Sequence, residues 1–234
     1  MFRYMLGGGD FSTYLISLLL SLPIVFLALS LHESAHGYVA YKLGDPTARN
    51  LGRITLNPFK HLNLIGTLCM LLAGFGWANP VPINTRYFKK PRRDMALSAL
   101  AGPVSNLALA MIFAILLRFL GYGYLMQRLY PSELAATIAS FTVLFLYYGV
   151  YMNITLAVFN LLPVPPLDGS RLLYWLLPPK TAYKLSQYER YITIAVMLLL
   201  LLGPLSTLID GLTSLIMRGM FAVTGMGNFF SFFR

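Results

Sequence analysis

A long apolar stretch near the start of the sequence runs without a break into the ionisable residues His32, Glu33 and His36. Residues 11–43 contain no polar turn, so we expect one helix with a kink at Pro23. A helix of that length and composition can cross a membrane. Ionisable groups within a membrane-crossing segment cost about 2.5 kcal/mol or more each, so three together indicate a function that retains them.

The spacing of these residues indicates a metal site. His32 and His36 lie four positions apart and therefore on one face of a helix, where two imidazoles can hold one tetrahedral zinc ion. Glu33 lies just off that face, where it can act on a water molecule. The chain has only three His and three Glu, so a chance His-Glu-x-x-His is expected in fewer than about one such chain in a thousand. A core histidine with a purely structural role is the favoured alternative for a single His, and it is the minor alternative for this pair.

The composition predicts an all-α polytopic membrane protein, because 57% of its 234 residues are hydrophobic and only 11% are charged. We expect about four to six transmembrane helices, with short re-entrant or strand-like segments near the His-Glu motif. The length fits a single domain, 1–234, with a core over about 15–175 and peripheral C-terminal helices over 176–234. The net charge of +10 does not require nucleic acid, because the basic residues cluster between apolar spans.

The basic residues also predict an orientation and two unusual segments. Lys42 and the basic residues that follow it place the His-bearing end of the first helix on the cytoplasmic side. Residues 48–56 alternate as a strand would, and 62–77 is too short and glycine-rich for a crossing, which favours a re-entrant segment. We hypothesise that a locally unwound substrate pairs as an added strand with residues 46–61 and with the proline-rich stretch 78–84.

A catalytic zinc ion needs a third protein ligand and an open position. The remaining candidates are Asp10, Asp45, His61, Asp94, Glu133, Asp168, Glu189 and Asp210. Asp10, Glu133 and Asp210 fall near the outer ends of spans, while Asp45, Asp94 and Glu189 neighbour basic residues or turns, where we expect solvated surface. Asp168 follows a helix that descends to the same side as the His pair, so depth favours it. His61 remains a competitor, because it is close in sequence and imidazole suits zinc.

Two asparagines within or beside predicted spans are further site candidates. Asn106 lies in the apolar span 95–117, and Asn160 lies near the end of 134–162. Either side chain can donate a hydrogen bond to a substrate backbone or to a developing oxyanion. Polar packing between helices is the alternative for both.

Three segments together resemble the site-2 protease family of intramembrane zinc metalloproteases. They are His32-Glu33-Ser34-Ala35-His36, Gly102-Pro103-Val104-Ser105-Asn106 and the run from Asn160 to Gly169 that contains Leu167-Asp168-Gly169. The resemblance covers about residues 15–175. It implies that His32, His36 and Asp168 bind one zinc ion per chain and that Glu33 is the catalytic base. The chain resembles the compact form of the family, without the PDZ or CBS domains of many relatives.

The resemblance also implies the function. We expect hydrolysis of peptide bonds in or near transmembrane segments of single-span membrane proteins, in regulated intramembrane proteolysis. The protein would be a multi-pass protein of the cell membrane, with the lipid bilayer but no nucleic acid as partner, and the oligomeric state stays open. A metal-ion transporter is a rival, although it has no need for Glu33 between the ligands. A catalytically silent scaffold is another, although it need not keep the whole ligand set.

Overall fold

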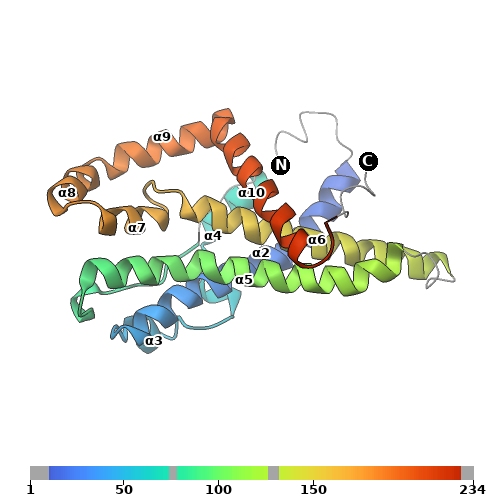
Figure 1. Ribbon diagram of the computed structural model, residues 1–234, viewed down its shortest axis with the longest axis horizontal. Coiled ribbons are helices and arrows are strands. Elements are labelled where there is room, and N and C mark those ends of the chain that lie inside the picture. Colours follow the sequence, from blue (N-terminus) through green and yellow to red (C-terminus); the bar gives the residue numbers. More distant parts are fainter. Residues whose placement is uncertain (1–10, 74–77, 126–131, 228–234) are drawn as a thin grey trace.

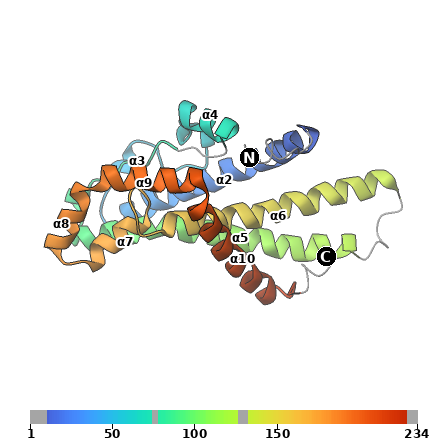
Figure 2. The same ribbon diagram turned by 90° about the horizontal axis from the view of Figure 1, so that it is seen from above.

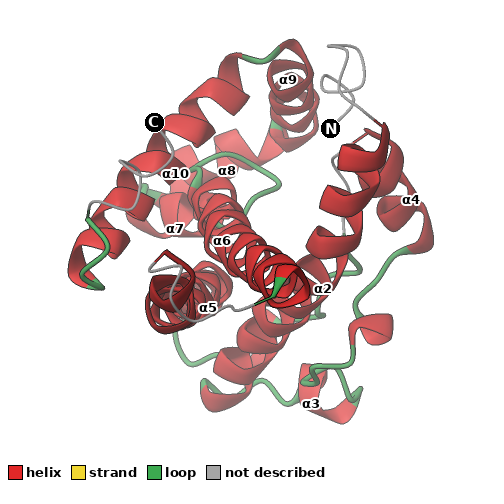
Figure 3. Cartoon of the chain, turned by 90° about the vertical axis from the view of Figure 1, so that its right-hand side faces the viewer, coloured by secondary structure: helices red, strands yellow, loops and turns green. Residues whose placement is uncertain are grey.

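The computed structural model describes residues 11–73, 78–125 and 132–227. Residues 1–10, 74–77, 126–131 and 228–234 lie outside these ranges. The candidate Asp10 and the end of the predicted re-entrant segment 62–77 fall among them. Within them every regular element is a helix, and the one β-contact is an isolated antiparallel bridge between Leu62 and Ala78 (Figure 3). The prediction of an all-α polytopic membrane protein is confirmed.

Three long helices form the body of the described structure: α2 (Phe11–Lys42), α5 (Pro91–Leu125) and α6 (Glu133–Leu161). Each is long and apolar enough to cross a membrane, and α2 is continuous through Pro23, as predicted. A fourth crossing would consist of α9 (Glu189–Leu202) and α10 (Pro204–Val223), which are bent by 76° at their junction. The described residues therefore hold three crossing helices, or four with this pair, where four to six were expected.

The α5–α6 hairpin is the centre of the fold, and the two helices run side by side along the long axis of the molecule (Figure 1). A close approach at Gly149 explains the tight fit, since a Cβ there would lie 2.5 Å from the ring of Phe113. The helix α2 packs against both helices, and α10 crosses α6 with Phe221 fully buried. These contacts bring the C-terminal ends of α2 and α6 and the N-terminal half of α5 to one region of the molecule.

The segment between α2 and α5 is not a pair of strands. It contains α3 (Thr47–Asn50), the short 3-10 turns η1 (Pro58–Lys60) and η2 (Thr85–Tyr87), and α4 (Leu64–Ala73). The prediction of a strand over 48–56 is wrong because the carboxylate of Asp45 accepts hydrogen bonds from the backbone N–H and hydroxyl of Thr47, which starts a helical turn. Gly52 then reverses the chain with a φ of 61°.

The helix α4 supports the prediction of a re-entrant segment. Its ten residues measure about 15 Å, roughly half the thickness of a bilayer core. The bridge between Leu62 and Ala78 joins the residues on either side of it, so the chain returns to the place from which it left. Figure 2 shows α4 beside α2 and away from the α5–α6 hairpin.

Three shorter elements follow α6: α7 (Gly169–Leu176), which packs against α5, and then α8 (Pro179–Gln187) and α9 (Figure 1). The guanidinium of Arg92 donates to the backbone carbonyls of Tyr174 and Leu177, which fixes the end of α7 on α5. The hydroxyl of Tyr174 donates to Glu189 over 2.9 Å, which joins α7 to α9. Burial and the neighbouring Glu189 raise the pKa of Tyr174 to about 12, so its hydroxyl stays a donor at neutral pH.

Candidate metal centre

The two motif histidines face each other across one turn of α2. Both are buried, their rings lie edge to face with centroids 4.5 Å apart, and their Nε2 atoms are 3.0 Å apart. This is the arrangement that the spacing of four residues predicts for a helix. The two Nε2 atoms therefore point into the same small volume.

The backbone of α5 sets the orientation of His36. Its Nδ1 lies 2.7 Å from the carbonyl oxygen of Ser98, and the hydroxyl of Ser98 donates back to the carbonyl of His36 over 2.9 Å. A carbonyl can only accept, so Nδ1 carries the hydrogen and Nε2 presents its lone pair. Such an outer partner both orients an imidazole ligand and raises its basicity.

Asp168 completes the cluster from a distant part of the chain. Its Oδ2 lies 3.1 Å from Nε2 of His32 and 3.2 Å from Nε2 of His36. Gly169 follows because a Cβ there would collide with the backbone carbonyls of Leu161 and Leu162. Asp168 thus enters the cluster where the chain turns into α7.

The geometry of the three atoms fits zinc. Ligands 2.0–2.1 Å from a tetrahedral ion lie about 3.3 Å from one another, and the observed separations are 3.0 to 3.2 Å. The approaches to Oδ2 of Asp168 are not aligned as hydrogen bonds, which leaves that buried oxygen without a donor. Among the described residues these three side chains form the candidate metal-binding group. Three such donors leave one tetrahedral position for water.

Gly102 on α5 makes the room for this cluster. A Cβ at this position would lie 2.5 Å from both Cε1 of His32 and Nε2 of His36. We expect Gly102→Ala to displace the imidazoles at a cost of about 1–3 kcal/mol, or about 5- to 150-fold in zinc affinity. Titration of the purified metal-free chain with zinc measures this. Gly211→Ala is the matched control, because nothing lies within 4 Å of its added Cβ. Equal zinc affinities for the two variants would contradict this account of Gly102.

Glu33 lies beside the cluster and is held by a neighbouring segment. Its Oε2 accepts a hydrogen bond of 2.9 Å from the backbone N–H of Val81. The next residue, Ser34, donates its hydroxyl to the carbonyl of Thr55 over 2.6 Å and accepts the N–H of Thr55 over 3.0 Å. The motif turn of α2 is therefore anchored to two loop segments as well as to α5.

The structure separates the two candidate asparagines. Asn106 is fully buried on α5, one turn beyond Gly102, and in the described structure neither its amide nitrogen nor its amide oxygen has a hydrogen-bond partner. Asn160 donates its amide to the carbonyl of Leu156 in its own helix over 2.9 Å. The amide N–H groups of Asn106 are therefore free to donate to another molecule, whereas the amide of Asn160 already donates to a carbonyl of its own helix.

The structure also places three other ligand candidates, His61, Asp45 and Asp94. His61 is fully buried outside the cluster and its Nε2 lies 2.8 Å from the carbonyl oxygen of Thr55. The prediction that Asp45 and Asp94 are solvated is wrong, since both are buried. Asp45 binds backbone N–H groups of Thr47 and Asn84, and Asp94 binds the N–H of Lys90 and the guanidinium of Arg93. These donors offset the cost of burying each carboxylate.

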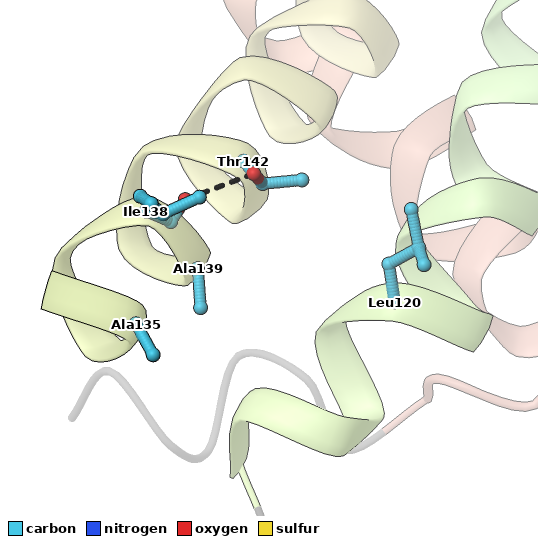
Figure 4. Close-up of a pocket in the computed structure, with 5 residues that line it drawn as sticks. All are labelled: Leu120, Ala135, Ile138, Ala139 and Thr142. Atoms are coloured by element: carbon cyan, nitrogen blue, oxygen red, sulfur yellow. Dashed lines mark hydrogen bonds between the residues drawn. The ribbon is translucent and has the colours of Figure 1, made fainter. Parts of the chain in front are cut away.

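A separate apolar pocket of about 330 Å³ lies between the end of α5 and the start of α6. Figure 4 shows Leu120 on one side and Ala135, Ile138, Ala139 and Thr142 on the other. The hydroxyl of Thr142 donates to the carbonyl of Ile138 in its own helix. The residues that line this pocket carry no titratable group, and they are distinct from the cluster.

Comparison with known proteins places this geometry in context. The model of peptidase family M50 matches residues 20–204. YwhC of Bacillus subtilis (strain 168) is 45% identical over 199 residues, which cover 84% of this chain and 87% of that protein. Rip2 of Mycolicibacterium smegmatis is 30% identical and Rip2 of Mycobacterium tuberculosis (strain H37Rv) is 32% identical, over 66% and 64% of their lengths. All three are named as zinc metalloproteases. No solved structure matches the chain.

Proposed function

Because the chain belongs to peptidase family M50, the site-2 protease family, it is a membrane-embedded zinc metalloprotease, and we propose that it cleaves single-span membrane proteins in or beside their transmembrane segments. The observation that carries the proposal is the convergence of His32, His36 and Asp168 near the C-terminal ends of α2 and α6. These three side chains would hold the zinc ion, with Glu33 next to them as the catalytic base.

The chain's own groups have defined tasks in this proposal. Bound zinc supplies Lewis acidity, which lowers the pKa of water and polarises a peptide carbonyl. Glu33 accepts a proton from the attacking water and later delivers it to the leaving amine. The unpartnered amide of Asn106 donates to the developing oxyanion. Asn160 belongs to this proposal only as a secondary donor, because its amide already bonds within α6.

We place the active site near the cytoplasmic side of the membrane. Lys42 ends α2, and Arg92 and Arg93 begin α5, so basic residues mark the helix ends nearest to the cluster. Lys180 and Lys184 lie exposed on α8 at the same end. By the charge bias of membrane proteins this end faces the cytoplasm, and water then reaches the cluster from that side. Regulated intramembrane proteolysis is the setting that fits such a site.

Co-expression tests the substrate class. Cells that express either the wild-type chain or Glu33→Gln are supplied with tagged single-span membrane proteins, and the tagged fragments are analysed by mass spectrometry. We expect fragments that end within or next to a transmembrane segment with the wild type alone. Fragments that are identical with both chains, or cuts confined to soluble domains, would refute the proposal.

A further inference from the structure

A backbone group of the segment Ala78–Asn84 contacts the functional site. We infer that the backbone N–H of Val81 is a positioning group that aims the carboxylate of Glu33. The inference rests on the proposed role of Glu33 as base and adds the residue that orients it. The contact itself is a hydrogen bond of 2.9 Å from Val81 to Oε2.

The side chain of Val81 fixes the position of this donor. Val81 is 7% exposed, and its Cγ1 would lie 3.2 Å from a Cβ built on Gly37. The segment therefore lies directly against α2, one turn beyond Glu33. Gly37 permits this approach because it has no side chain of its own. A shift of the segment would break the contact with α2 and the hydrogen bond to Glu33 together.

Hydrogen bonds hold the segment on both sides of Val81. The N–H of Asn79 donates to the carbonyl of His61 over 2.7 Å, and Arg53 donates to the carbonyl of Asn79 over 2.6 Å. At the other end the N–H of Asn84 donates over 2.6 Å to the buried carboxylate of Asp45. A segment with this many anchors is a fixed part of the site rather than a strap that opens.

Val81 lies between two prolines, Pro80 and Pro82. Pro80 and Pro82 carry no N–H, so the only donor between them is that of Val81, which is bound to Glu33. A strand edge pairs through both N–H and C=O groups, and the stretch Pro80–Pro82 has no free N–H for such pairing. Its one N–H is bound to the carboxylate of Glu33.

The two carboxylate oxygens of Glu33 then have different roles. Oε2 is engaged by Val81, which restricts the side chain and leaves Oε1 as the oxygen that takes the proton. Partners that orient groups in a metal site are typically worth 10- to 100-fold in activity. We expect an effect of about this size on kcat when the N–H is removed.

Hydrogen exchange tests the contact without zinc or substrate. The Val81 amide of the full-length, metal-free chain in detergent is expected to exchange at least about 10-fold faster in Glu33→Ala than in the wild type. The amides of Asn79 and Asn84 serve as internal controls, because their acceptors are unchanged. An unprotected Val81 amide in the wild type, or a rate that Glu33→Ala does not alter, would overturn the inference.

Kinetics test the consequence with a matched pair of variants. Val81→Pro removes the N–H, and the following Pro82 already restricts this residue to the extended backbone that proline adopts. Val81→Ala keeps the N–H and removes most of the side chain. The substrate is a synthetic peptide containing a transmembrane segment that the wild type cleaves, and zinc content is measured for each variant.

We expect Val81→Pro to lower kcat about 10- to 100-fold below the kcat of Val81→Ala, with KM and zinc content equal in the two variants, because only Val81→Pro lacks the N–H. Equal kcat values in the two variants would overturn the role of the N–H. A wild-type kcat in Val81→Pro, or a raised KM with kcat unchanged, would overturn the role of Val81. Loss of cleavage in Glu33→Gln would leave the proposed function standing in either case. Cleavage that survives in Glu33→Gln would instead refute the base and, with it, the proposed function.

Discussion

The substitution Glu33→Gln is expected to lower kcat for peptide cleavage about 10²- to 10⁴-fold while zinc stays bound. Glutamine has nearly the same shape and keeps an oxygen that can accept the N–H of Val81, so the side chain retains its place. The amide cannot take up a proton from water at neutral pH. The cluster of His32, His36 and Asp168 is left intact by the change.

Turnover and zinc content are measured on the same purified sample, because only their combination is informative. Glu133→Gln is the matched control, since Glu133 is exposed at the start of α6 and lies at the far end of that helix from Asp168. We expect this variant to cleave as the wild type does. Glu33→Gln enzyme with undiminished turnover would show that another group is the base.

The substitution Asp168→Ala is expected to remove zinc and activity together. It deletes one of the three atoms that lie 3.0 to 3.2 Å apart and leaves two imidazoles to hold the ion. Loss of an outer partner of a metal ligand typically costs 10- to 100-fold in affinity, so loss of the ligand itself should cost more than about 100-fold. The zinc content should fall from one ion per chain to a small fraction of that value.

Metal analysis after dialysis and thermal unfolding with and without added zinc provide the measurements. Zinc that binds only the folded state raises Tm, and this shift should disappear in Asp168→Ala. Asp210→Ala is the control, because Asp210 is exposed on α10 and hydrogen-bonds to Tyr151. Asp168→Ala protein that retains one zinc ion and a normal Tm shift would transfer the role of third ligand to another residue, with His61 as the first to test.

Local geometry explains what could be predicted from the sequence. The continuity of α2, the short length of α4 and the membrane class all follow from apolar length and helical spacing, which a residue's near neighbours determine. The facing imidazoles of His32 and His36 follow from the same periodicity. Asp168 required a further argument from membrane depth, and the structure places it within 3.2 Å of both rings. Its role as a ligand is still a prediction.

Contacts between distant segments decided the rest. The burial of Asp45 depends on the N–H of Asn84, and the turn at 47–50 depends on the same carboxylate. Asn106 and Asn160 differ because only the amide of Asn160 donates to a carbonyl of its own helix. The donor to Glu33 is a backbone N–H, which every residue except proline carries, so the identity of residue 81 gives no sign of it. The sequence determined a membrane helix that bears two imidazoles and a carboxylate, because the placement of these side chains depends only on the helix period over one or two turns. Only the tertiary structure decided what faces them, because that depends on backbone groups far away along the chain.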